Sequence, residues 1–377
     1  MSGRGFGVYV HWPYCERVCP YCDFNVVRAR GREDEAAALA RAILADLVGW
    51  RALTGPRKLD SIFFGGGTPS LMAAETAAAV IERSRALWPP RGEPEITLEA
   101  NPSDIAAFEG FATAGVNRLS LGVQALNDAD LARLGRNHDA AAARRAIAAA
   151  TAVFPRVSLD LIYALPGQRP EAWRATLEAA ADLGAEHISP YQLTIEPGTA
   201  FARAAGRGTL VAPDPELAAE LYETTQGTLG DLGFEAYEVS NHARSPAARA
   251  RHNLIAWRGG DYLGVGPGAH GRLTLGDRRY ASEAPRGVGE YVRRLRAHGT
   301  GAALTPLSDR EAALERLLMG LRTSEGVAWS DLEPLAAPDE RVARLDGLVR
   351  SEAGRLTATA RGRLVLDRVI AELADAA

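Results

Sequence analysis

The cysteines of the chain are concentrated in one short stretch, YCERVCPYCDF, at residues 14–24. They are Cys15, Cys19 and Cys22, the only three in 377 residues, and an odd number of thiols cannot all form disulfides. A structural zinc site takes four nitrogen or sulfur ligands, usually in two separated pairs, and the sequence offers no second pair. A [4Fe–4S] cluster is normally held by four thiolates. Three would leave one iron free to bind a substrate or a cofactor.

Two other interpretations of these cysteines stay open. His11, four residues before Cys15, would complete a set of four zinc ligands, although it falls inside the preceding apolar run. Three cysteines can also be ordinary buried apolar side chains. The intervening residues Glu16, Arg17 and Pro20 instead favour an exposed loop, in which the thiols are available to a metal.

Six apolar runs, alternating with stretches of helical spacing, are expected to position this loop. Their β-branched, nearly continuous apolar character is typical of parallel strands that are covered on both faces. Strand-then-helix units join through right-handed crossovers, so the sequence predicts an α/β fold, either an open doubly wound sheet or an incomplete barrel. The runs occupy residues 7–12, 59–66, 95–100, 118–124, 157–165 and 187–195.

Polar residues stand at the ends of five of these runs. Parallel α/β folds bind their ligands at the C-terminal ends of the strands. Polar strand ends can also simply meet solvent, but their recurrence on five strands favours one shared site. The residues are His11, GGGTP (65–69), EANP (99–102), Gln124 and Asp160.

Composition narrows the classes of function. The formal net charge of −4 at pH 7 gives no electrostatic reason to expect nucleic acid as a partner. No apolar run reaches the ~20 residues that a transmembrane helix needs, and no signal-like segment opens the sequence. We therefore expect a cytoplasmic protein. In that compartment thiols stay reduced, and a cysteine cluster is more often a metal or redox site than a disulfide framework.

The C-x3-C-x2-C spacing after the first strand and the glycine-rich turn FFGGGTPS after the second resemble the radical S-adenosylmethionine (SAM) superfamily, over essentially the whole chain. The resemblance implies a partial (β/α)6 barrel and a [4Fe–4S] cluster on three cysteines, whose open iron binds the amino and carboxylate groups of SAM. In that superfamily the reduced cluster passes one electron to the sulfonium, which yields a 5′-deoxyadenosyl radical.

The same resemblance assigns cofactor-binding residues. Gly66, Gly67 and Thr68 are expected against the methionyl part of SAM, and Glu99 against its ammonium or its ribose hydroxyls. The other residues expected to bind the cofactors are Tyr9 beside the cluster, Tyr21 in the cysteine loop, and Gln124, Arg136 and Asp160 in the SAM pocket.

Within the superfamily, YVHWPYC, EANP, NRLSLGVQ and DLIYALPGQ are most similar to the oxygen-independent coproporphyrinogen III oxidase group. The oxidases carry a further cysteine two residues after the third, where this chain has Phe24. Its absence is the pattern of the HemW haem chaperones. Those proteins also carry an HNxxYW motif associated with haem. The segment RHNLIAW (251–257) matches that motif except that Ala256 replaces the tyrosine.

The resemblance to HemW implies a haem chaperone that delivers its haem to recipient haem proteins. His252 is then the expected axial ligand, because imidazole binds haem iron well, and His270 is a second candidate. The other interpretation of His252 is a buried, hydrogen-bonded side chain. Two alternative functions are an oxygen-independent coproporphyrinogen III oxidase and a SAM-radical enzyme with another substrate. The sequence does not decide whether SAM is cleaved or whether the chain forms a homodimer.

Three regions are predicted. Residues 1–200 form the partial barrel, and residues 201–305 extend it with the HNxxxW motif and a glycine-rich loop at 259–271. Residues 306–377 read as a small α-rich, winged-helix-like module. Its acidic and basic residues are mixed, which favours an interaction or lid role over binding to nucleic acid.

Overall fold

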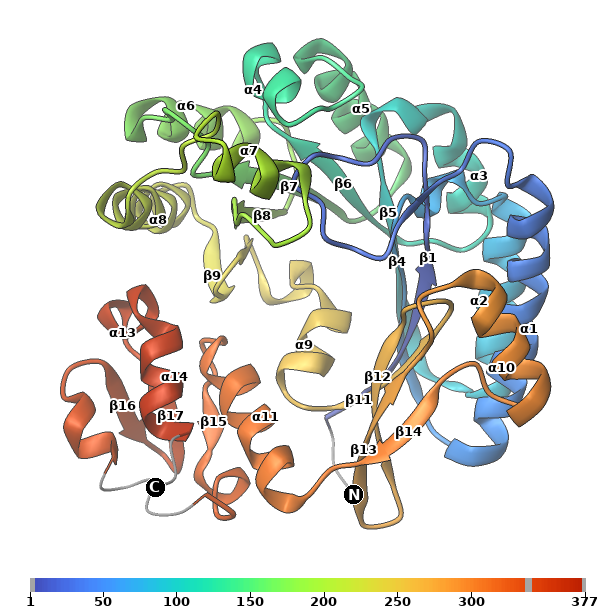
Figure 1. Cartoon of the computed structure of the whole chain (residues 1–377). Helices are drawn as coiled ribbons and strands as arrows, with labels where there is room; N and C mark the ends of the chain where they lie inside the picture. Colours follow the sequence, from blue (N-terminus) through green and yellow to red (C-terminus); the bar gives the residue numbers. More distant parts are fainter. Residues whose placement is uncertain (1–3, 336–340, 375–377) are drawn as a thin grey trace.

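The computed structural model describes residues 4–335 and 341–374. Its main sheet has twelve strands in the order β14-β13-β12-β11-β1-β4-β5-β6-β7-β8-β10-β9 (Figure 1). The six predicted strands form its centre, and consecutive members are parallel, so the α/β class and the incomplete barrel are confirmed. They are β1 (Phe6–Trp12), β4 (Leu59–Gly66), β5 (Pro90–Ala100), β6 (Arg118–Gln124), β7 (Val157–Tyr163) and β8 (His187–Gln192).

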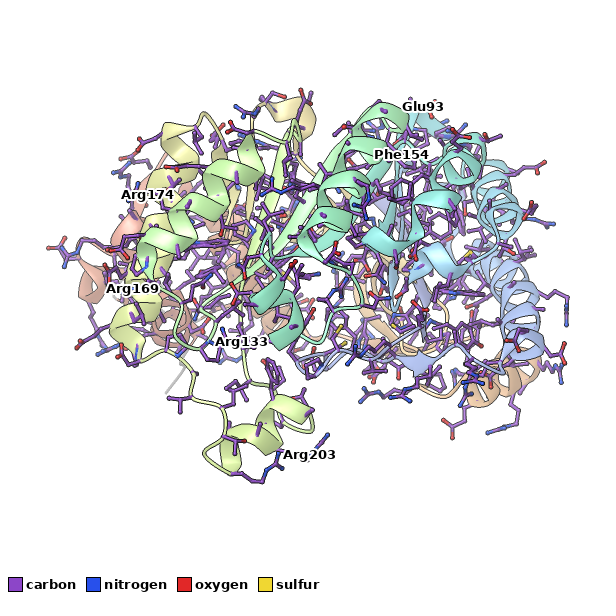
Figure 2. All side chains as sticks on the ribbon, turned by 90° about the horizontal axis from the view of Figure 1, so that it is seen from above. Glu93, Arg133, Phe154, Arg169, Arg174 and Arg203 are labelled. Carbon is purple, nitrogen blue, oxygen red and sulfur yellow. The ribbon has the colours of Figure 1, made fainter. Side chains whose placement is uncertain are left out.

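Helices cover the outer face of this sheet. The longer ones are α1 (Glu33–Thr54), α2 (Ala74–Leu87), α5 (Ala140–Val153), α6 (Pro170–Ala181) and α8 (Pro215–Asp231). Shorter helices are α3 (Phe108–Thr113), α4 (Asp128–Arg133) and α7 (Ala200–Gly206). Seen from above, α7 with the labelled Arg203 projects from the body of the molecule (Figure 2).

The inner face of the central strands is largely polar, unlike the two apolar faces that the sequence predicts. Val8 and Val10 of β1 and Leu119 and Leu121 of β6 lie fully buried against the helices. The residues between them, such as Ser120, face the inside of the barrel. The pleat alternates side chains between the two faces of a strand, and this inner face borders cavities rather than a second layer of helices.

The glycine-rich stretch predicted as a loop at 259–271 is partly sheet instead. β11 (Asp261–Val265) pairs with β1 in parallel, and β12 (His270–Leu275), β13 (Arg278–Glu283) and β14 (Ala303–Pro306) continue antiparallel. At the far edge, β8 is followed by β10 (Asn241–Ala243) and β9 (Glu235–Glu238). The helix α9 (Arg251–Trp257) lies between the two edges, packed against β4 and β11 (Figure 1).

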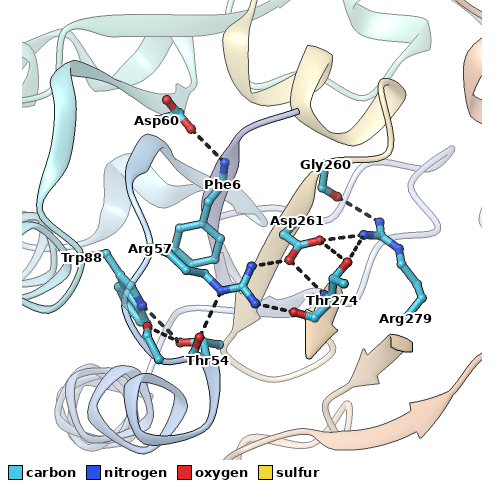
Figure 3. Close-up of polar contacts among 10 residues, drawn as sticks. Phe6, Thr54, Arg57, Asp60, Trp88, Gly260, Asp261, Thr274 and Arg279 are labelled. Carbon is cyan, nitrogen blue, oxygen red and sulfur yellow. Dashed lines mark hydrogen bonds and ion pairs between the residues drawn. The ribbon is translucent and has the colours of Figure 1, made fainter. Parts of the chain in front are cut away.

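A buried carboxylate ties this edge extension together. Asp261 of β11 accepts hydrogen bonds from the backbone N–H and the hydroxyl of Thr274 at 2.9 and 3.0 Å. It also pairs with Arg279 of β13 at 2.7 Å and with Arg57 from the α1–β4 connection (Figure 3). Two guanidinium groups and two donors compensate one buried charge, which is the condition for burying it without large cost.

The C-terminal residues build a separate small core. It contains α11 (Asp309–Leu321), α13 (Ala360–Leu364), α14 (Leu366–Ala374) and a sheet of β15 (Val327–Ala328), β17 (Arg355–Ala358) and β16 (Val349–Glu352). Ion pairs join it to the barrel: Arg4–Asp331 and Arg272–Glu315, both at 2.7 Å, and Arg258–Glu325 at 2.5 Å. Within the described residues, no helix has the length and apolarity that a bilayer span requires.

A second buried carboxylate, Asp46 of α1, fixes the helix to the extension. It accepts hydrogen bonds from the hydroxyl of Tyr291, in α10 (Val288–His298), at 2.6 Å and from the N–H of Gly301 at 2.8 Å. Burial raises the pKa of Asp46 to about 6. Removing the carboxyl would therefore leave two buried donors without an acceptor.

We predict that Asp46→Ala lowers the free energy of unfolding by roughly 3 kcal/mol, because each unsatisfied buried donor costs about 1–3 kcal/mol. Asp46→Asn should lose less, since the carboxamide keeps one acceptor oxygen. Urea denaturation followed by circular dichroism measures both, with the exposed Arg41→Ala on the same helix as the control. Equal stability of the Ala and Asn variants would contradict the assignment.

Candidate functional site

A cavity of about 610 Å³ opens at the C-terminal ends of the central strands. Its wall includes all the residues that the sequence predicts for the cluster and the cofactors except Tyr9, His252 and the second haem-ligand candidate His270. Those residues are Cys15, Cys19, Tyr21, Cys22, Gly66, Gly67, Thr68, Glu99, Gln124, Arg136 and Asp160. We call this space the first cavity.

The cysteine loop leaves β1 and is framed by two short parallel strands, β2 (Tyr14–Cys15) and β3 (Val27–Arg28). Cys15 is buried, whereas Cys19 and Cys22 are partly exposed. The hydroxyl of Thr68 lies 3.5 Å from the sulfur of Cys15, and the guanidinium of Arg136 lies 3.3 Å from the sulfur of Cys19. Helix α7 holds the loop from outside, since the N–H of Phe201 donates to the carbonyl of Pro20 at 2.9 Å.

The chemistry of this donor set fits a cluster better than one ion. Burial raises the pKa of Cys15, and raises the pKa of Cys22 to about 11, so only a bound metal would turn these thiols into thiolates near neutral pH. Across residues 4–335 and 341–374, no three His, Cys, Asp or Glu side chains are arranged to hold a single metal ion. In a [4Fe–4S] cluster each thiolate binds a different iron, so the three sulfurs need not converge on one point.

The glycine turn supports the cysteine loop directly. The N–H of Gly67 donates to the carbonyl of Trp12 at 2.7 Å, and the N–H of Thr68 donates to that of Tyr14 at 2.8 Å. A Cβ on Gly67 would lie 2.7 Å from the same Tyr14 oxygen, closer than real contacts allow. These N–H groups are therefore used within the protein.

Two carboxyl groups, Glu99 of β5 and Asp160 of β7, face the first cavity. Burial, and then the negative charge of Asp160, raise the pKa of Glu99 to about 8, although the N–H of Gly66 donates to Glu99 at 3.2 Å. Burial raises the pKa of Asp160 to about 6, although the hydroxyl of Ser120 donates to it at 2.9 Å. A cationic group between them would favour both ionised forms.

Two further predicted residues are Gln124, the last residue of β6, and Arg136, which follows helix α4. Arg136 donates to the carbonyl of Gly122 at 2.9 Å and to the side chain of Asn101. Gln124 has a φ of 67°, which is uncommon for a residue other than glycine and arises where the register between β6 and β7 shifts. Backbone strain of this kind gathers at binding sites.

Several residues that line the first cavity were not predicted from the sequence. Arg118 is only 2% exposed and yet lines the cavity, as do Ser120, Ser189 and Asn241. A partial signal exists, because Arg118, Ser120 and Gly122 alternate with apolar residues along β6. That period of two marks one face of a strand, but only the folded barrel tells which face is inner.

A second cavity of about 520 Å³ adjoins the first and shares Phe24, Gly66 and Glu99 with it. Tyr9 and His252, which are missing from the first cavity, line this one, as does the second candidate His270. The other residues of its wall are His11, Asn25, Ala256, Tyr262, Gly268, Glu283 and Arg286.

His252 is buried at the base of the second cavity. Its Nδ1 lies 2.9 Å from the hydroxyl of Ser61, and its backbone N–H donates to Glu95 at 2.9 Å. Its ring lies 5.1 Å from that of Phe63, and burial lowers the pKa of His252 to about 4, so the imidazole is neutral. The next residue, Asn253, borders the first cavity. Helix α9 thus contributes side chains to both spaces.

Comparison with known proteins agrees with this architecture. Residues 9–180 match the model of the radical SAM superfamily, and residues 307–365 match that of the HemN C-terminal domain. The chain superimposes on the structure of coproporphyrinogen III oxidase (HemN) from Escherichia coli with a TM-score of 0.81, covering 98% of this chain and 90% of the other. At 22% sequence identity this likeness establishes the fold.

Curated relatives cover almost the whole chain. The Heme chaperone HemW of Mycobacterium tuberculosis is 36% identical over 99% of this chain and 96% of its own length. The bovine Radical S-adenosyl methionine domain-containing protein 1, mitochondrial, is 39% identical over 97% of this chain and 86% of its own. HemW of Escherichia coli is 40% identical over 72% of this chain and 71% of its own. The chain therefore belongs to the HemW family of the radical SAM superfamily.

Proposed function

We propose that this protein is a cytoplasmic haem chaperone, which binds a [4Fe–4S] cluster, SAM and haem and delivers the haem to recipient haem proteins. The observation that carries the proposal is the similarity to the Heme chaperone HemW of Mycobacterium tuberculosis over nearly the full length of both chains. The alternative oxidase function rests on fold likeness alone, because the solved HemN structure is only 22% identical.

Cys15, Cys19 and Cys22 would hold the cluster, with Thr68 and Arg136 as hydrogen-bond donors to its sulfur ligands. Such donors stabilise thiolates and tune a cluster's potential. When bound, a cluster with one open iron supplies a site for SAM and a source of single electrons. Tyr21 stands beside this site, and its ring lies 6.2 Å from that of Phe201, which steadies the loop.

SAM would occupy the first cavity. Its sulfonium is a cation, and the paired carboxyls Glu99 and Asp160 offer the opposite charge where water is largely excluded. Arg136 would balance its carboxylate, and Gln124 would bind a polar edge. Gly66, Gly67 and Thr68 form the turn beside it. Tyr9 faces the second cavity, so its contact with SAM would be indirect.

Haem would be held through His252. Metal-binding histidines usually have one ring nitrogen fixed by a hydrogen bond, so that the other is oriented toward the metal. Ser61 fixes Nδ1 of His252 in this way and leaves Nε2 for iron. Ala256 lines the same cavity where the family motif has tyrosine, and the smaller side chain leaves more room there.

Phe24 argues against the oxidase chemistry. It stands where the oxidases carry a fourth cysteine, and its side chain is 62% exposed at the wall shared by both cavities. A phenyl ring offers neither a thiol nor a metal ligand. It does offer an apolar surface to a large flat ligand such as a porphyrin.

We predict that anaerobically reconstituted protein holds about four irons and four sulfides per chain. Replacing Cys15, Cys19 or Cys22 singly with Ala should abolish the cluster, because two thiolates do not retain it. Iron and sulfide assays together with the visible absorption spectrum test this, and circular dichroism checks that each variant is folded. A triple Cys→Ala variant that still carries a full cluster would refute the ligand set.

We further predict that the reconstituted protein binds haem and does not decarboxylate coproporphyrinogen III. Haem titration and product analysis, run in parallel on one preparation with SAM and a reductant, distinguish the two functions. Transfer of haem to an apo haem protein should appear as the spectrum of the holo acceptor. Steady decarboxylation by the wild-type protein would defeat the chaperone proposal and support the oxidase.

A further inference from the structure

Three histidines line the second cavity, and their ring nitrogens differ in availability. Both nitrogens of His11 are engaged, one 2.9 Å from the hydroxyl of Tyr9 and the other 2.9 Å from the carbonyl of Asn25. His252 has one nitrogen engaged by Ser61. The ring of His270 is exposed and makes no hydrogen bond to any other residue that the structure describes. Two of the three therefore have a nitrogen available to a metal.

The register of the sheet places His270 on the same face as Tyr9. Tyr9 of β1 pairs with Gly264 of β11. Because Tyr262 pairs antiparallel with Arg272, Gly264 falls opposite His270. Residues aligned across neighbouring strands point to the same side. His270, Gly264 and Tyr9 thus form one row on the inner face, and two strand spacings of about 4.8 Å separate His270 from Tyr9.

The row continues to His252 through Phe63 of β4. Tyr9 pairs with Phe63, and the ring of His252 lies 5.1 Å from Phe63 and 6.4 Å from Tyr9. His252 and His270 therefore border the same space from its two sides. The backbone of His270 passes close over Gly264, because a Cβ on Gly264 would lie 2.2 Å from the carbonyl oxygen of His270. This close approach holds His270 at the wall of the second cavity.

Apolar, cationic and acidic groups complete the wall, the acidic ones being Glu99 and Glu283, the latter paired with His270 in the register of β12 and β13. The exposed Phe24 presents an aromatic face, and Arg286 and Asn25 belong to the same wall. A tetrapyrrole needs an apolar surface for its ring, a cation for its carboxylates and nitrogen ligands for its iron. The second cavity supplies all three kinds of group.

We propose that His270 is a second axial ligand of the bound haem iron, on the face opposite His252. This inference rests on the proposed haem-binding function and adds to it a ligand outside the HNxxxW motif. His252 and His270 each donate a nitrogen lone pair to the ferric iron and replace its two water ligands, and no electron is transferred. The two ligands differ in setting: His252 is buried and held by Ser61, whereas His270 lies exposed at the rim.

The different exposure of His252 and His270 determines the order in which the two ligands would release the haem iron. An exposed ligand can be replaced by a side chain of another protein without opening the core, whereas the buried ligand holds the iron until the replacement is made. The recipient would therefore approach from the side of β12, and its own ligand would displace His270 first.

The test is the absorption and electron paramagnetic resonance spectrum of ferric haem bound to the full chain. Wild-type protein should give a six-coordinate, low-spin bis-imidazole spectrum. His270→Ala should give a high-spin spectrum with haem still bound, and added free imidazole should restore the low-spin form. His298→Ala, at an exposed histidine in the last turn of α10, is the matched control and should leave the wild-type spectrum unchanged.

The outcomes separate this inference from the function on which it rests. If wild-type protein binds no haem, the proposed function itself fails. If it binds haem but is high-spin, or if His270→Ala stays low-spin, the chaperone proposal survives and the assignment of His270 is overturned. Rescue by imidazole excludes misfolding of the variant as the cause of a changed spectrum.

Discussion

The alternation of side chains between the two faces of the parallel strands determines where the core and the cavities of this protein lie. In β1 and β4–β8 the outward residues are apolar and carry the core with the helices, while the inward residues are largely polar. The sheet remains open between β9 and β14, and the inner face borders two cavities. Glu99 and Asp160 are then forced into a largely dry space, and this raises the pKa of both.

The central strands and the gathering of the three cysteines in one loop were predictable because their signals are local. A continuous apolar run marks a buried strand wherever it lies, and three cysteines within one short loop will meet whatever surrounds them. The same local reasoning failed at 259–271, where glycines indicated a loop. Gly264 is instead required by close strand packing, since a Cβ would collide with the carbonyl of His270. The close contact comes from β12, the next strand in the chain, whereas the strand that places β11 in the sheet is β1, which is remote in sequence.

Residues whose role depends on facing the interior were hardest to predict. Arg118 and Ser120 begin an ordinary strand, and only the curvature of the sheet turns them toward the first cavity. The support that the glycine turn gives to the cysteine loop was also not predictable, because its N–H groups donate to Trp12 and Tyr14 from a distant part of the chain. Tyr9 and His252 were expected with different partners but border one cavity together. In each case the deciding contact joins segments far apart in the chain.

The affinity of the cluster-loaded protein for SAM as a function of pH tests most directly whether the buried carboxyl pair is there for a cationic cofactor. A cation prefers ionised carboxylates, and the pKa of Glu99 is about 8, so binding should tighten as pH rises from 6 to 9. Glu99→Gln should bind more weakly and lose most of this dependence, whereas Glu171→Gln, at an exposed position, should behave as wild type. An affinity that is independent of pH, or that falls as pH rises, would contradict this view of the site.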